Sequence, residues 1–174
     1  MLAVFAFVSP ATAVEPNKQD TDRLPDYSTW KALTPKPVRV DRAQATACES
    51  AARIRPRVKL GPHSTPAVKY YANAEGAKGL EVGPKEAMPV GATIVKEKYD
   101  AATDAKPSAY AAMIKREPGY DKENGDWEYL FVELAEKPVV TRGAIKSCIQ
   151  CHTLAQKKDY LFRTHLAQPV PRTP

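Results

Sequence analysis

The sequence predicts an α+β fold in which a mainly antiparallel β-sheet is flanked by helices, and the C-terminal helix carries a Cys-Ile-Gln-Cys-His motif. Two observations predict this class. Apolar and polar residues alternate with a period of two in several short segments between residues 68 and 134, as in strands with two different faces. The longer helical sequences lie before and after these segments, at residues 42–53 and 141–156, and only a helical turn at residues 74–80 lies between them. Strands grouped in this way form antiparallel sheets with helices at one face or end.

The N-terminus is interpreted as an export signal. Residues 2–8 are apolar, and Ala11-Thr12-Ala13 has the small residues of a signal-peptide cleavage site, which makes residues 1–13 a signal peptide. The apolar run is too short to span a bilayer, which needs about 20 residues, and no basic segment precedes it. An apolar N-terminal strand and an uncleaved membrane anchor are the alternatives.

Two proline-rich regions flank the main domain that the sequence predicts. Residues 14–55 are predicted to form a proline-rich arm with a helical turn at Tyr27 to Leu33 and an alanine-rich helix at residues 42–53. The main domain is expected at residues 56–166. A proline-rich tail follows at residues 167–174.

Each element expected within the main domain follows from a local pattern. Alternating β-branched and aromatic residues predict strands, and the Pro-Gly and Asn-Gly pairs of residues 118–125 predict a turn between the last two strands. The C-terminal helix is expected over Thr141 to Gln156. The expected strands are residues 68–71, 92–99, 110–116 and 127–134, with a helical turn at residues 74–80.

The charge pattern argues against nucleic acid as a partner. The formal net charge is +6 and the pI is about 9.2, but basic and acidic residues alternate along most of the chain. A nucleic-acid-binding segment usually has a run of about five or six Lys or Arg residues, and the sequence has none. A mildly basic exported protein accounts for the charge.

The motif at Cys148, Cys151 and His152 is the attachment signature of c-type haem. Two thiols on one helical turn can form thioethers to the haem vinyl groups, and the adjacent imidazole then lies beneath the iron as proximal ligand. We therefore expect one covalently bound haem c. Half of a zinc site and a redox-active disulfide are alternatives, but the sequence has no second Cys-x-x-Cys pair and no thioredoxin-like βαβ pattern.

The third cysteine, Cys48, lies in the alanine-rich segment. We interpret it as a small buried residue of a helix. An odd cysteine in an exported protein can also be a reactive thiol or form an intermolecular disulfide, and these remain alternatives.

Three blocks of sequence make the chain similar to the cytochrome P-460 family over residues Gly61 to Thr164. They are the segments Gly91–Glu97 and Gly125–Phe131, and the Cys-x-x-Cys-His motif followed by Lys158–Phe162. The motif alone is common to many cytochromes. The three blocks in this order and spacing are more specific.

The resemblance implies a mainly antiparallel β domain flanked by helices, a homodimer and a five-coordinate haem. Family members named cytochrome P-460 oxidise hydroxylamine and handle nitric oxide, and a lysine forms an additional covalent bond to their haem. By the Gly-x-x-x-Val-Lys-Glu match, that lysine corresponds to Lys96. A related branch, the cytochromes c-prime-beta, lacks this crosslink and binds small gases at an apolar distal face.

Lys96 also has an ordinary interpretation, because most strand lysines point to water. Two departures from the family pattern weaken the enzyme hypothesis. Catalytic members carry a carboxylate above the iron, and the alignment places Ala111 there. A basic residue that some members have on the first strand aligns near Val68 or Lys69. Hydroxylamine oxidation removes protons as well as electrons, so a missing base should slow it.

Several other residues are candidates for the haem site. His63, in Gly61-Pro62-His63, could be a sixth iron ligand or a distal acid or base, and a surface turn is the alternative. Met88 and Met113 are lesser candidates for an axial ligand, and a core position is the alternative for Met113. Lys115 and Arg116 could pair with haem propionates or lie at a solvated strand end. His165 is expected on the surface after the C-terminal helix. The aromatic residues Trp127, Tyr129 and Phe131 are expected to pack in the core on one sheet face, and packing against the porphyrin or a dimer mate is the alternative.

Two hypotheses follow for function. In the first, the iron binds hydroxylamine, nitric oxide or a similar small ligand at an open or labile position, and oxidation of that ligand is an additional activity that the hypothesis leaves open. In the second, the protein is an electron carrier or a cytochrome subunit with a six-coordinate haem, and His63 is the sixth ligand. Both place the protein in the periplasm with a redox partner protein, as a homodimer or in association with a membrane complex.

Overall fold

The computed structural model describes residues 26–40, 67–82 and 86–163. The predicted signal peptide, the alanine-rich segment and the C-terminal tail lie outside these residues. Three candidate residues also lie outside them: Cys48, His63 and His165. No helix among the described residues is both long and apolar enough to cross a membrane.

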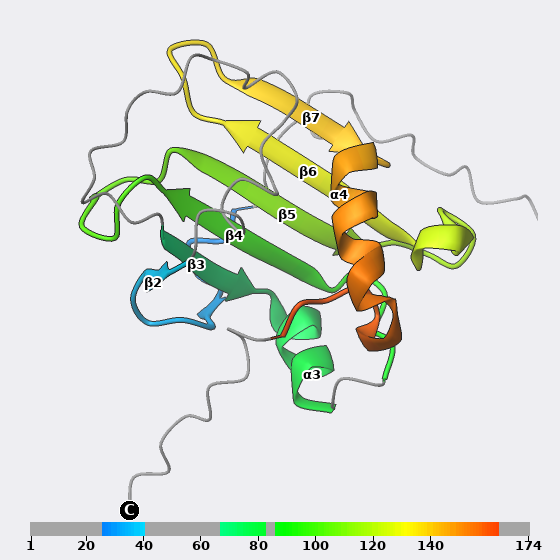
Figure 1. The fold of residues 1–174 in the computed structure, drawn as a ribbon. Coiled ribbons are helices and arrows are strands. Elements are labelled where there is room, and N and C mark those ends of the chain that lie inside the picture. Colours follow the sequence, from blue (N-terminus) through cyan, green and yellow to red (C-terminus); the bar gives the residue numbers. More distant parts are fainter. Residues whose placement is uncertain (1–25, 41–66, 83–85, 164–174) are drawn as a thin grey trace, which may run out of the picture.

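The core of the fold is an antiparallel sheet of seven strands (Figure 1). Its order along the sheet is β1-β3-β4-β5-β6-β7, and β2 also pairs with β3. Sequence neighbours from β3 to β7 are therefore neighbours in space, as in a meander. The strands are β1 (Lys31–Ala32), β2 (Val38–Arg39), β3 (Ala67–Ala72), β4 (Thr93–Tyr99), β5 (Ala109–Lys115), β6 (Trp127–Glu133) and β7 (Val139–Gly143).

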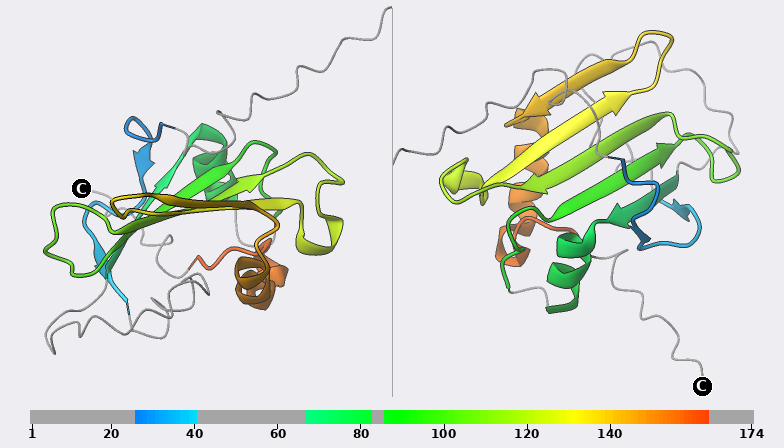
Figure 2. Two further views of the ribbon diagram at one scale, coloured as in Figure 1. Left: turned by 90° about the horizontal axis from the view of Figure 1, so that it is seen from above. Right: turned by 180° about the vertical axis from the view of Figure 1, so that it is seen from behind.

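Helices lie at one face and one end of this sheet. Figure 2 shows the sheet nearly edge-on, with α4 packed across one face and running on into η3. The helix α3 follows β3 and packs against the ends of β3 and β4, where Ala77 and Leu80 contact the core. The helical elements are α3 (Ala74–Val82), η2 (Lys122–Asn124), α4 (Lys146–His152) and η3 (Thr153–Lys158).

Two hydrophobic cores lie on the two faces of the sheet. The face covered by α4 contributes Ile94, Met113, Trp127 and Tyr129, and Cys148 and Ile149 of α4 pack against them. The other face contributes Val95, Ala112, Leu130 and Val132, and is covered by Tyr27 and Trp30. Strand pairing explains this separation, because alternate residues of one strand point to opposite faces.

The predicted α+β class and the four central strands are confirmed. β3, β4, β5 and β6 each lie within about two residues of their expected bounds, as usual for element boundaries. The register places Met113 opposite Ile94 and Tyr129. Trp127, Tyr129 and Phe131 therefore share one face, as their alternation predicted.

The prediction of a helix over Thr141 to Gln156 is wrong in its first turn. Residues 139–143 form β7, which pairs with β6 from Glu133 to Tyr129. Val139, Val140 and Thr141 are β-branched and favour the extended backbone. Gly143 then adopts a φ of 111°, which ends the strand, and α4 starts three residues later.

The helical turn predicted over Tyr27 to Leu33 is also wrong. A tight turn is closed by the Trp30 N–H, which donates to the Tyr27 carbonyl at 3.0 Å. The chain then enters β1, where Lys31 pairs with Ala72 of β3. The open edge of β3 supplies hydrogen bonds that a short isolated helix could not match.

Candidate functional site

The Cys-x-x-Cys-His motif lies on the short helix α4. The N–H of Ile149 donates to the carbonyl of Ile145 at 3.0 Å, which forms the first turn. Cys148 and Cys151 are half-buried, and Cys148 and Ile149 pack against the hydrophobic core of the sheet. Both thiols are therefore held on one turn of a helix that is fixed to the sheet, as two thioether bonds to one porphyrin require.

His152 is oriented by a hydrogen bond from its side chain to the backbone. Its Nδ1 lies 2.7 Å from the carbonyl oxygen of Tyr160. A carbonyl only accepts hydrogen bonds, so Nδ1 carries the proton and Nε2 keeps its lone pair. Metal-ligating histidines almost always donate their other ring N–H in this way. The tautomer at His152 is thus the one that an iron ligand needs.

The protonation state of His152 also suits a ligand. Burial lowers the pKa of the imidazole, and the positive charge of Lys96 lowers it further, while the bond to Tyr160 acts in the opposite direction. The rings of Tyr129 and Phe162 both lie 5.4 Å from the ring of His152, measured between centroids. These contacts favour a neutral imidazole in a fixed orientation.

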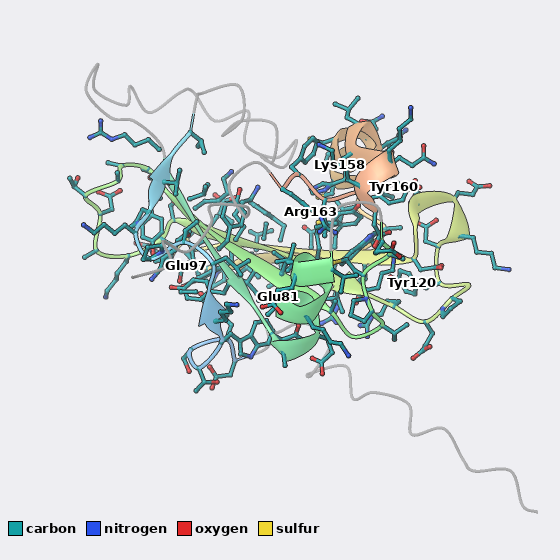
Figure 3. All side chains as sticks on the ribbon, turned by 90° about the horizontal axis from the view of Figure 1, so that it is seen from below. Glu81, Glu97, Tyr120, Lys158, Tyr160 and Arg163 are labelled. Carbon is teal, nitrogen blue, oxygen red and sulfur yellow. The ribbon has the colours of Figure 1, made fainter. Side chains whose placement is uncertain are left out.

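The carbonyl of Tyr160 is held by an unusual backbone. Asp159 and Tyr160 have φ values of 50° and 61°, so two consecutive residues other than glycine are left-handed. The N–H of Tyr160 donates to the Ala155 carbonyl at 3.0 Å, which closes the end of η3. Figure 3 shows Tyr160 beside the C-terminal helix, close to Lys158 and Arg163.

Lys96 lies on β4 and on the face of the sheet that α4 covers. Strand register places Tyr70 and Ala111 directly opposite it, and Phe131 is opposite Ala111 on the next strand. Lys96 is half-buried, and its charge acts on the pKa of His152. The structure therefore brings Lys96 and Ala111 together with the motif helix on one side of the sheet.

Two buried polar atoms of the described residues have no hydrogen-bond partner there: the Tyr129 hydroxyl and Nε of Arg163. Tyr129 is 2 % exposed. Burial raises the pKa of its hydroxyl, and the neighbouring Cys148 and Cys151 raise it further. An orphaned buried hydroxyl beside the two motif thiols indicates that another group completes this site.

The remaining candidates on the described residues have other roles. Met88 and Met113 are buried in the core on the α4 side, as the alternative interpretation predicted for Met113. Lys115 forms an ion pair with Asp159 at 2.8 Å, and Arg116 forms one with Glu128. Both cations therefore already have carboxylate partners within the protein.

A cavity of about 350 Å³ lies beside this region, next to η3. Residues 153–158 and Leu161 to Arg163 line it, but the cysteines of the motif and Lys96 do not. The candidate site is consequently defined by the motif helix and the sheet face rather than by this cavity.

The chain matches the model of the Cytochrome P460 family over residues 25–163. The chain belongs to the cytochrome P460 family. Membership of the P460 family implies a haem cofactor, and it confirms the resemblance inferred from the three sequence blocks. No significant match was found among curated proteins.

The residues of this P460 chain fit a haem. The two motif thiols are on one helical turn, His152 has an available Nε2, and the Tyr129 hydroxyl is orphaned beside them. Cys148, Cys151 and His152 would hold the group. Among the described residues, no cluster of three or more His, Cys, Asp or Glu side chains forms a site for a bare metal ion.

Sequence reasoning missed the residues that orient His152. Asp159 and Tyr160 belong to one of the blocks shared with the family, and the sequence assigns neither of them a role. Their position shortly after the motif, in Lys158-Asp159-Tyr160, was the one local signal. Lys115, which forms the ion pair with Asp159, is 44 residues away in the sequence, and no local pattern links these two residues.

Proposed function

We propose that this P460-family chain is an exported monohaem c-type cytochrome whose haem is attached through Cys148 and Cys151 and ligated by His152. The observation that carries the proposal is the 2.7 Å contact between Nδ1 of His152 and the Tyr160 carbonyl. This bond selects the tautomer with a free lone pair on Nε2 and fixes the plane of the ring. The half-buried thiols, Cys148 one turn before His152 and Cys151 directly before it, support covalent attachment.

The proposed ligand is a small nitrogenous or gaseous molecule such as hydroxylamine or nitric oxide. When bound, the haem supplies an iron centre that changes oxidation state by one electron and holds such a ligand. Lys96, Ala111 and Phe131 lie side by side on the sheet face beside α4. This pattern supports an apolar ligand pocket with one cation at its side, and Lys96 is our candidate for a haem crosslink.

The surroundings of Lys96 favour ligand binding over oxidation of hydroxylamine. Oxidation needs a group that accepts protons, usually a carboxylate or a histidine. The partners of Lys96 across the sheet are Tyr70 and Ala111, so no carboxylate stands opposite it on the described strands. We therefore propose binding as the primary activity, with oxidation as the secondary one.

The second candidate function is electron transfer through a six-coordinate haem, with His63 as the sixth ligand. Its support is the Gly-Pro-His sequence before β3 and the alanine at position 111. His63 lies outside the described residues. The periplasm as location and a redox partner protein belong to both functions, and they rest on the N-terminal apolar run and on the c-type motif.

One set of spectra of the purified full-length protein tests the proposal. We expect a reduced haem spectrum that changes when carbon monoxide or nitric oxide is added, and a pigment that stays with the protein in acidified organic solvent. A pigment that washes out would refute covalent attachment. A low-spin spectrum that neither gas changes, and that His63→Ala converts to high spin, would select electron transfer instead.

The role of Lys96 is tested separately by Lys96→Ala. We expect a shift in the absorption bands of the haem, since this side chain lies on the proposed ligand side. Lys69→Ala is the matched control, because Lys69 lies on the neighbouring strand but pairs with Glu97 on the opposite face. Equal spectra for both variants and the parent protein would remove Lys96 from the site.

A further inference from the structure

The carbonyl that orients His152 is held in place by a buried ion pair on the sheet. Nζ of Lys115 on β5 lies 2.8 Å from Oδ1 and 2.9 Å from Oδ2 of Asp159. The side chains of both residues are only 11 % exposed. Asp159 directly precedes Tyr160, whose carbonyl accepts the hydrogen bond from His152.

Further hydrogen bonds fix the position of Asp159 through both its side chain and its main chain. Its Oδ2 accepts the N–H of Met88 at 2.7 Å, and its backbone carbonyl accepts Nε1 of Trp127 at 3.1 Å. Lys115 itself also donates to the carbonyl of Gly125 at 2.8 Å. The residue therefore connects β5, β6 and the segment before β4.

These bonds explain why the chain accepts a strained backbone here. Two consecutive left-handed residues other than glycine are unfavourable and persist only where surrounding structure compels them. On the Tyr160 side, the hydroxyl donates to the Glu123 carbonyl at 3.0 Å, and the buried ring packs against Gly125. Contacts of both Asp159 and Tyr160 therefore offset the backbone strain next to the carbonyl that faces His152.

We propose that the Lys115–Asp159 ion pair is a positioning device for the proximal ligand, which sets the strength of the His152–Tyr160 hydrogen bond and thereby the reduction potential of the haem. A shorter N–H···O bond makes the imidazole a stronger donor to the iron and favours the ferric state. The inference rests on the proposed function, because it needs an iron at His152. Lys115 and Asp159 are positioning residues and do not themselves touch the ligand.

The test uses the full-length haem protein and the variants Lys115→Met and Asp159→Asn. Each removes one charge of the pair with little change in volume, so the Tyr160 carbonyl should relax away from His152. We expect both to shift the ferric–ferrous equilibrium about tenfold toward ferrous iron, or about 59 mV for one electron. The iron–histidine stretching frequency should fall in both. Lys115→Arg keeps the charge and should restore most of the parent potential.

Glu128→Gln is the matched control for a general loss of stability. Glu128 is a buried carboxylate paired with arginines at the face away from α4, so its loss should lower the melting temperature without moving the potential. Trp127→Phe is a second variant for the event that Lys115→Met or Asp159→Asn does not fold. It removes the 3.1 Å bond to the Asp159 carbonyl and shrinks the ring that Nζ of Lys115 faces at 5.0 Å, while both charges of the ion pair remain, and it should shift the potential in the same direction.

The outcomes separate the two proposals. A coloured parent protein whose potential and stretching frequency do not change in the folded variants overturns the positioning role alone. The same result follows if Glu128→Gln shifts the potential as much as Asp159→Asn. A parent protein without covalent haem overturns the proposed function, and this inference with it.

Discussion

On the face of the sheet away from α4, buried polar groups are matched with partners from the protein itself. Glu97 accepts hydrogen bonds from the hydroxyls of Tyr27 and Tyr99, at 3.0 and 2.6 Å. Glu128 lies between Arg116 and Arg142. On the α4 side, the Tyr129 hydroxyl and Nε of Arg163 are buried without a partner among the described residues.

Figure 3 shows Arg163 and Tyr160 beside the C-terminal helix, with Glu97 well apart from them. Both faces have dense hydrophobic cores and buried carboxylates, so hydrophobicity does not distinguish them. Buried polar atoms without hydrogen-bond partners distinguish the two faces, because burying such an atom destabilises the folded protein unless another group bonds to it. The face with incomplete bonding is the one that would receive a ligand.

The largest expected effect comes from His152→Ala on the α4 side. The variant loses the proposed proximal ligand, so we expect loss of most haem from the purified protein or a large change in its absorption spectrum. Phe162→Ala is the control, because Phe162 also contacts the His152 ring but is 42 % exposed and has no atom that could coordinate iron. If the spectrum of His152→Ala matches that of the parent protein, the imidazole is not the iron ligand.

A smaller effect is expected on the opposite face, where acid should break the bonds to Glu128. Burial opposes ionisation, but the hydrogen bonds from Arg142 and Arg116 lower the pKa of Glu128 below its ordinary value overall. A carboxyl with a lowered pKa in the folded state adds stability at neutral pH and loses it as the pH falls below about 4.5.

Glu128→Gln should therefore lower the free energy of unfolding at pH 7 by about 2 to 3 kcal/mol and weaken its decline in acid. This is below the full cost of breaking a buried ion pair, because the Arg116 side chain is 40 % exposed. Urea unfolding at several pH values measures both quantities. An unchanged acid dependence in the variant would assign the acid sensitivity to other carboxyls.

The elements that the sequence predicted depend on local patterns, and those that it did not predict depend on contacts between residues distant in sequence. The strands β3 to β6 were predictable because alternation is a local property of each segment, and the Cys-x-x-Cys-His motif could be recognised because its residues are contiguous. β7 was missed because its β-branched residues run directly into the motif helix, where the pairing with β6 decides the structure. In the site, Lys115 was a candidate for a haem propionate, but its ion pair with Asp159 was not predicted because the two residues are distant in sequence.

The smallest expected effect compares one hydroxyl from each face. Tyr99→Phe removes a 2.6 Å bond to Glu97 and should lower the free energy of unfolding by about 1 to 2 kcal/mol without altering the haem spectrum. Tyr129→Phe removes a hydroxyl that has no partner among the described residues, so its effect on unfolding should be within about 0.5 kcal/mol. Its position beside the motif thiols should instead change the haem absorption bands or the affinity for nitric oxide. Spectral titration and urea unfolding of both variants measure the two effects. A changed haem spectrum in Tyr99→Phe, together with a loss of stability in Tyr129→Phe, would place the ligand on the opposite face.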